Sequence, residues 1–137
     1  MNMAIVRKIR ELEASIQQLR KFQKYSYDEI KDDLEKLWAI EHGLQISIQI
    51  IIDIGNHIIA EIGENEIEEY ADILDRLVKH NIIPLEFAEN IRGMIGFRNL
   101  LVHRYSEVDS KIVYSVLQNR LYDFERFIGY IQSFFNW

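Results

Sequence analysis

The sequence predicts an all-α protein, an up-and-down bundle of about five helices, on three observations. Apolar residues recur at steps of three and four along most of the 137 residues, which is the period of an amphipathic helix. Two patterns of the form Ser/Asn-x-x-Glu, typical of helix starts, precede apolar runs. Proline occurs once and no serine- or glycine-rich linker is present, so we expect a single domain over residues 1–137.

The first expected helix ends near Lys24 and has one apolar face. Charged residues occupy the positions between the apolar ones, as on a helix that packs one side against a core. The apolar face consists of Ile5, Ile9, Leu12, Ile16, Leu19 and Phe22.

A long second helix is expected from Tyr27 to Gly63. A capping box at residues 26–29 marks its start, and we expect no break before Gly63. Residues 44–62 are apolar around most of the helix, which predicts cover on most sides, including a partner subunit. A strand over residues 45–54 is the alternative because isoleucine is β-branched, but the capping signals and the flanking sequence favour a helix.

A short helix and a longer one are expected next. A second capping signal at residues 65–68 begins the short helix, which ends near His80. Pro84 suits the first turn of the following helix. Gly93 and Gly96 lie three apart on it and would let another backbone come close.

The last expected helix is capped by Asp109 or Ser110 and continues towards the C-terminus. Apolar residues at helical spacing define its buried side. They are Ile112, Val116, Leu121, Phe124, Phe127, Ile128, Ile131, Phe134 and Phe135.

Composition excludes several classes of protein. The absence of cysteine excludes disulfides, thiolate metal sites and thiol catalysis. The charged, periodic N-terminus does not resemble a signal peptide, and the apolar run at residues 46–54 is too short and polar to span a bilayer, so we expect a cytoplasmic protein. The formal charge of −6 counts against a broad nucleic-acid-coating face. It leaves room for a small cationic cleft, because a phosphate responds to charge within about 8–10 Å.

Residues 96–105, which read GFRNLLVHRY, gather the chemically active side chains. Arg98 and Arg104 are permanent cations whose donor geometry suits phosphate. His103 belongs to the residue type that exchanges protons near neutral pH, and Tyr105 offers a hydroxyl. On an unbroken helix His103 would lie about 140° from Arg98, so the two would face different sides. A helix that ends close to His103, or a second copy of the motif across a two-fold axis, would bring them together.

This stretch resembles the signature of the HepT-like branch of the HEPN superfamily. The shared pattern is Arg98-Asn99, an aliphatic pair, then His103 and Tyr105. Residues 45–57 resemble the family's long second helix, and residues 84–94 resemble its approach to the motif. The family pattern often has a Glu-Arg pair in the long helix, where this chain has Glu41-His42.

The resemblance implies a HEPN-like fold and a metal-independent endoribonuclease toxin, usually a homodimer, that needs no cofactor and acts on RNA. Its usual partner would be a minimal nucleotidyltransferase antitoxin that adds AMP to the motif tyrosine. Carried over, Arg98 and His103 are the catalytic pair, Asn99 supports them, and Tyr105 is the modified residue. Arg104 is expected to support the site as the second cation of the cleft. We also consider that Asp53 orients Arg98 across the bundle.

Plainer interpretations of these residues stay open. Arg98 and Arg104 would be surface cations paired with nearby acids, His103 a helix-end histidine, and Tyr105 a packing aromatic. The row Asp53, His57 and Glu61 falls short of the protein ligands of a catalytic zinc site, so a solvated row is favoured and no metal is expected. The rival functions are a catalytically inactive nucleotide- or protein-binding module and a purely structural helical adaptor.

Overall fold

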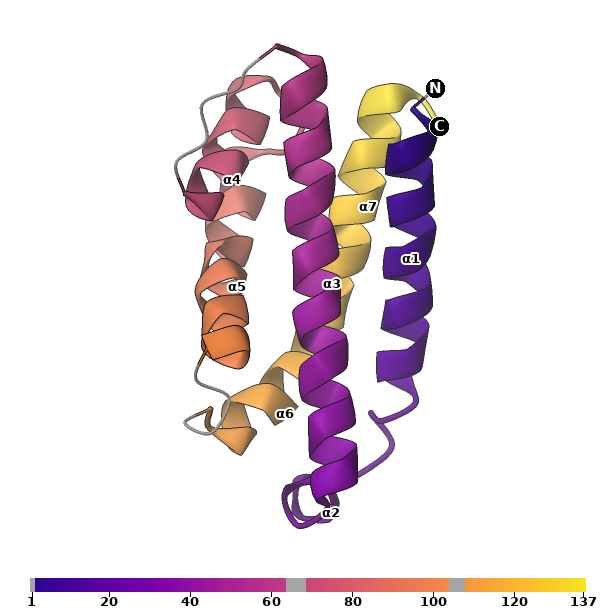
Figure 1. Cartoon of the computed structure of the whole chain (residues 1–137), viewed down its shortest axis with the longest axis vertical. Coiled ribbons are helices and arrows are strands. Elements are labelled where there is room, and N and C mark those ends of the chain that lie inside the picture. Colours follow the sequence, from indigo (N-terminus) through magenta and orange to yellow (C-terminus); the bar gives the residue numbers. More distant parts are fainter. Residues whose placement is uncertain (1, 64–68, 104–107) are drawn as a thin grey trace.

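The structure, a computed structural model, describes residues 2–63, 69–103 and 108–137. Every regular element in these ranges is helical, which confirms the all-α class (Figure 1). The described ranges contain seven helices rather than about five. They are α1 (Met3–Arg20), α2 (Tyr27–Lys31), α3 (Leu34–Glu61), α4 (Tyr70–Lys79), α5 (Leu85–His103), α6 (Ser110–Asn119) and α7 (Leu121–Phe135).

The 28-residue helix α3 is the axis of the bundle. In Figure 1, α1 and α7 lie on one side of it and α4 and α5 on the other, while α2 and α6 lie at the lower end. The two chain termini lie close together at the upper end. By length and composition α3 would suffice to cross a membrane, but 56% of its most apolar stretch is buried inside the bundle, as expected of a core helix.

The expected single helix from Tyr27 to Gly63 is wrong at its start. The capping box forms as predicted, with Ser26 Oγ accepting from Glu29 N–H at 3.2 Å. The helix then stops after one turn because Asp33 adopts an extended conformation (φ −120°, ψ 97°) and caps a new helix. Its carboxylate accepts the backbone N–H of Lys36 at 3.2 Å.

The last expected helix is also divided, at Arg120. Asp109 caps α6 as predicted, since its carboxylate accepts the N–H of Lys111 at 2.8 Å. At the division, Arg120 Nη2 donates to the carbonyl of Asn90 on α5 at 2.6 Å, and its Nε donates to Asp123 at 2.5 Å. The bond to Asn90 ties the junction of α6 and α7 to α5, so a tertiary contact stabilises the break.

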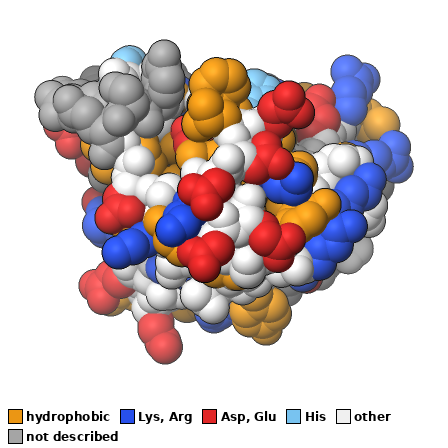
Figure 2. All heavy atoms as spheres, turned by 90° about the horizontal axis from the view of Figure 1, so that it is seen from below, with side chains coloured by type: hydrophobic (Ala, Val, Ile, Leu, Met, Phe, Trp, Pro, Cys, Tyr) orange, Lys and Arg blue, Asp and Glu red, His pale blue; other side chains and the backbone are white. Residues whose placement is uncertain are grey.

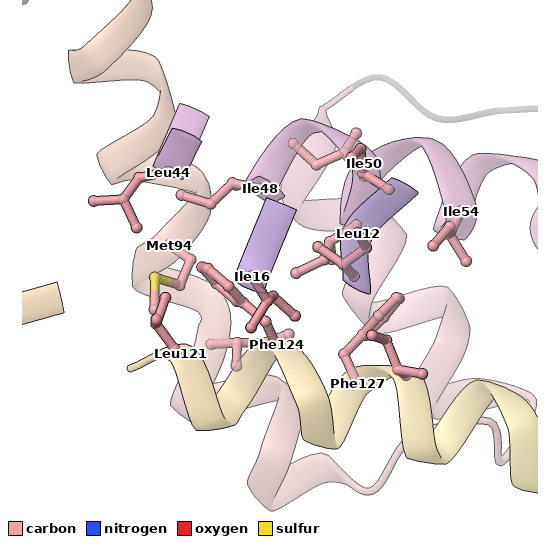
Figure 3. Packing of buried hydrophobic residues seen from close by; sticks show 14 of the residues in the cluster. Leu12, Ile16, Leu44, Ile48, Ile50, Ile54, Met94, Leu121, Phe124 and Phe127 are labelled. Atoms are coloured by element: carbon pink, nitrogen blue, oxygen red, sulfur yellow. The ribbon is translucent and has the colours of Figure 1, made fainter. Parts of the chain in front are cut away.

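The core lies where α1, α3, α5 and α7 meet. Figure 3 shows Leu12 and Ile16 of α1 close to Phe124 and Phe127 of α7, with Met94 of α5 beside Leu121. The predicted apolar face of α1 is buried from Ile5 to Leu19.

Two glycines of α3 are points of close helix packing. A Cβ at Gly55 would lie 2.4 Å from Ile73 Cγ2 on α4, and one at Gly43 would lie 2.7 Å from Leu19 Cδ2 on α1. Gly93 and Gly96 on α5 differ from them, because nothing in the described chain lies within 4 Å of a Cβ at either position. The close approach expected at these two glycines is therefore not made by any described residue.

Candidate functional site

A hollow of about 710 Å³ lies between the start of α4 and the second half of α5. It contains three of the predicted site residues, Arg98, Asn99 and His103. The other described lining residues are Glu69, Tyr70, Arg92, Ile95 and Gly96.

The spacing of these residues along α5 determines which side of the helix each side chain occupies. Arg92, Gly96, Asn99 and His103 lie within about 60° of one another around the helix, and Arg98 lies about 100° from Asn99. Arg98 nonetheless lines the same hollow as His103, which is the last described residue of α5. Both arrangements expected from the spacing, a helix that ends near the histidine and a second copy of the motif, stay predictions.

Arg98 keeps hydrogen-bonding capacity for a ligand. Its Nη1 donates to Asn99 Oδ1 at 3.0 Å, and its Cζ lies 5.4 Å from the ring centroid of Tyr70. Its Nε is buried and has no hydrogen-bond partner within the described ranges. No ion pair joins this guanidinium to a carboxylate among the described residues, so its charge is available to an anion.

The second arginine in the hollow, Arg92, forms a salt bridge with α4. Arg92 Nη2 donates to Asp75 of α4 at 2.7 Å, which neutralises part of its charge and links α4 to α5. Glu69 adds one carboxylate to the wall. Arg98 is therefore the cation of the described lining that no carboxylate balances.

A sequence model of the family described as ribonuclease HepT-like matches residues 12–131. The chain belongs to the HepT-like family. This confirms the predicted family and, with it, the ribonuclease class.

Individual relatives agree with this assignment. The mRNA nuclease HepT of Shewanella oneidensis is 31% identical over 134 residues, covering 97% of this chain and 99% of that protein. The tRNA nuclease HepT of Aphanizomenon flos-aquae is 28% identical over 116 residues, covering 85% of this chain and 79% of that protein. A solved structure of the tri-AMPylated Shewanella oneidensis HEPN toxin in complex with MNT antitoxin superposes with a TM-score of 0.88. It is 30% identical and covers 97% of this chain and 99% of that one.

Not every residue predicted for the HepT-like site lies in the hollow. Asp53 on α3 lies in a separate hollow with Lys8 and His57, where it contacts Lys8 Nζ at 3.5 Å and accepts from Gln49 Nε2 at 2.9 Å. The described partners of Asp53 therefore lie on α1 and on its own helix, and Asp53 does not orient Arg98 as expected. No group of three or more metal-ligating side chains is assembled in the part of the chain that the structure describes.

Arg104 and Tyr105 lie outside the described residues, as does the capping signal at residues 65–68. Their assignments therefore stay predictions.

The pair Glu41-His42 lines another hollow, of about 380 Å³, on the other side of the end of α5. Leu101 and Val102 form its α5 wall, and Trp38, 58% exposed, belongs to its α3 wall. Burial raises the pKa of the Glu41 carboxyl above its ordinary value. This hollow is separate from the one that holds Arg98.

Sequence reasoning missed Tyr70, Arg92 and Glu69. Arg92 had a usable signal, because it lies seven residues before Asn99 and so on the same face of the helix. Tyr70 is the first residue of α4 and Glu69 is its N-cap, and nothing in the local sequence indicates which part of α5 they meet.

Proposed function

We propose that this HepT-like chain is a metal-independent endoribonuclease toxin that acts as a homodimer in the cytoplasm. A minimal nucleotidyltransferase antitoxin would hold it inactive by adding AMP to Tyr105. The observation that carries the proposal is the shared hollow of Arg98 and His103, in which the arginine lacks a balancing carboxylate among the described residues. The names of the relatives, two nucleases and an AMPylated toxin bound to its antitoxin, support it.

The proposed reaction is attack of a ribose 2′-hydroxyl on the adjacent phosphorus, with departure of the 5′-oxygen. One group must accept the 2′-hydroxyl proton and another must donate a proton to the leaving oxygen. His103 is the side chain of the hollow best suited to either role. Arg98 would stabilise the charge that builds on the phosphoryl oxygens, a contribution of about 2.7–4 kcal/mol for one preorganised donor.

A second copy of the chain would supply the second histidine. Gly93, Gly96 and Leu100 lie within about 60° of each other on α5, and His103 lies next to Gly96 on the same face. Nothing in the described chain covers the two glycines, and Leu100 is 44% exposed. A symmetric partner seated on this face would bring two His103 side chains towards one groove.

Modification of Tyr105 would block the site by charge and by volume. The tyrosine oxygen would attack the α-phosphorus of ATP, pyrophosphate would leave, and the hydroxyl proton would pass to solvent or to a base of the nucleotidyltransferase. The transferred AMP would place a phosphodiester near Arg98, which is seven residues earlier in the sequence, and occupy the space of a substrate phosphate. Arg104 would add a cation next to this position.

The distribution of charge disfavours approach of RNA from the lower end of the bundle, where α2 precedes α3. Asp28, Glu29, Asp32 and Glu35 are exposed near the start of α3. Figure 2 shows acidic side chains gathered in the middle of this lower end, with a row of Lys and Arg side chains along one edge. Carboxylates repel a phosphate backbone, so this end is a poor docking face for RNA.

The test is cleavage of RNA by the purified protein in the presence of EDTA. We expect Arg98→Ala and His103→Ala each to lower the rate about 10²-fold or more. Two substitutions are matched controls that should cleave at the wild-type rate: Arg10→Ala, at an exposed position of α1, and His57→Ala, in the separate hollow. Cleavage that survives both motif substitutions, or that requires a divalent metal, would remove the mechanism.

The dimer and the modification have tests of their own. Gly93→Arg should give a monomer by analytical ultracentrifugation and abolish cleavage, whereas Gly129→Arg on α7 should do neither. Intact mass after incubation with the nucleotidyltransferase and ATP should rise by AMP in the wild type and stay unchanged in Tyr105→Phe.

A catalytically inactive binding module is the second candidate. It is favoured by the presence of only one histidine in the described lining of the hollow, where acid–base cleavage needs two groups. It predicts RNA or nucleotide binding that depends on Arg98, with no cleavage at any protein concentration.

A further inference from the structure

Tyr70 is the group from outside α5 that the described structure places against the Arg98 guanidinium. The Arg98 Cζ lies 5.4 Å from the Tyr70 ring centroid, within the range of a cation–π contact. The other bond of Arg98 is to Asn99, its neighbour in sequence, and therefore cannot fix the side chain relative to α4. A long arginine side chain loses rotamer entropy when it is held in one orientation, so a phosphate-binding arginine benefits from an external support.

Three contacts fix the helix α4 that carries Tyr70. It is the first residue of α4, where Asp72 accepts the N–H of Glu69 at 3.3 Å and so fixes the turn. Ile73 packs onto Gly55 of α3, and Arg92 of α5 bonds to Asp75 one turn further along α4. The ring is 40% exposed and lines the hollow, so it is placed for a role at the site as well as for packing.

We infer that Tyr70 is a positioning residue of the ribonuclease site, whose ring holds the Arg98 guanidinium in the orientation that receives the scissile phosphate. The inference rests on the proposed function, because it assigns Arg98 to the transition state. The ring acts through the arginine and does not touch the reacting atoms. Its hydroxyl has no hydrogen bond within the described residues and takes no part.

The consequence for catalysis is a loss in kcat. A cation–π contact between about 0.5 and 2 kcal/mol corresponds to a fall of about 2–30-fold when the ring is replaced by leucine. Tyr70→Phe and Tyr70→Trp keep an aromatic face and should stay within about 2-fold of the wild type. Because the support acts on the reacting arginine, KM should change by less than about 2-fold in all three variants.

The experiment combines kinetics with a measurement that needs no cleavage. Steady-state cleavage of a short RNA in EDTA is compared for the three variants, alone and in the Arg98→Ala background, with folding checked by thermal unfolding. Tyr122→Leu, which removes an exposed tyrosine of α7, is the matched control. In parallel, the NMR signal of the Arg98 Nε–H, a buried group, is assigned by its disappearance in Arg98→Lys. The ring current of Tyr70 should shift this signal.

The expected result has three parts. Tyr70→Leu lowers kcat, has no further effect in the Arg98→Ala background, and moves the Arg98 Nε–H signal, whereas Tyr70→Phe and Tyr122→Leu leave all three readouts near the wild type. A rise in KM at unchanged kcat would make Tyr70 a base-binding residue and overturn the positioning role. Full additivity with Arg98→Ala, or equal losses in the phenylalanine and leucine variants, would overturn it too.

Failure of the proposed function has a different outcome. Wild-type protein that leaves RNA intact refutes the nuclease and the positioning role together, whatever the NMR spectrum shows. An Arg98 signal that stays in place in Tyr70→Leu, in an enzyme that cleaves normally, refutes the inference alone.

Discussion

The close packing of α4 on α3 predicts how much a substitution of Gly55 changes the free energy of unfolding. Alanine at Gly55 would place Cβ 2.4 Å from Ile73 Cγ2, a distance at which the Ile73 side chain or one of the two helices must shift. Overpacking of this kind costs about 1–3 kcal/mol. The better helix propensity of alanine returns about 1 kcal/mol, so the net loss of unfolding free energy is about 0–2 kcal/mol.

Gly129→Ala provides the matched comparison. This glycine also lies inside a helix, but nothing in the described chain lies within 4 Å of an added Cβ. The same substitution there should stabilise by about 0.5–1 kcal/mol. The two variants should therefore differ by about 0.5–3 kcal/mol, or by up to several degrees in Tm for a domain of this size.

The assay is urea denaturation followed by circular dichroism, at one fixed protein concentration because a dimer's stability depends on it. Gly55→Ala should unfold at lower urea than Gly129→Ala. Ile73→Ala, which removes the clashing Cγ2, should be less damaging in the Gly55→Ala background than in the wild type. If Gly55→Ala were as stable as Gly129→Ala, the close contact between α3 and α4 would be wrong.

Three further outcomes follow from single side chains. Burial raises the pKa of Glu41, so its ionised form destabilises the fold once the pH exceeds the folded pKa. Glu41→Gln should raise Tm at pH 7, with a gain that disappears as the pH falls below about 4, the ordinary pKa of a glutamate. Asp123→Ala removes the buried acceptor of Arg120 Nε, leaves that donor unpaired and should lower the unfolding free energy by about 1–3 kcal/mol, measured by urea denaturation. Arg92→Ala should reduce stability through loss of its bond to Asp75 and reduce RNA cleavage by less than Arg98→Ala, since Arg92 is already paired; equal losses of cleavage would contradict this division of roles.

Helices were predictable because their signals are local. The spacing of Ile5 to Leu19 and the capping box at residues 26–29 are confirmed. The break at Asp33 had a local signal, an aspartate before an apolar run, that the sequence reasoning did not weigh. The break at Arg120 had none, because it depends on a bond to Asn90, thirty positions away in the chain.

The site divides in the same way. Arg98, Asn99 and His103 were found from their spacing on one helix, and they line one hollow. Asp53 was expected to contact Arg98 across the bundle, but no local sequence signal supports a contact between two helices. Its partners are Lys8 and Gln49. The support of Arg98 by a ring on another helix is a tertiary contact, and a single sequence carries no record of it.

The chemical form of the cleavage products tests the central claim most directly. A chimeric RNA with one ribonucleotide in a DNA strand is incubated with the wild type in EDTA, and the fragments are weighed by mass spectrometry. Attack by the 2′-hydroxyl predicts a 2′,3′-cyclic phosphate on one fragment and a 5′-hydroxyl on the other, both lost with Arg98→Ala or His103→Ala. Fragments that carry a 5′-phosphate, or cleavage of an all-deoxy strand, would contradict it.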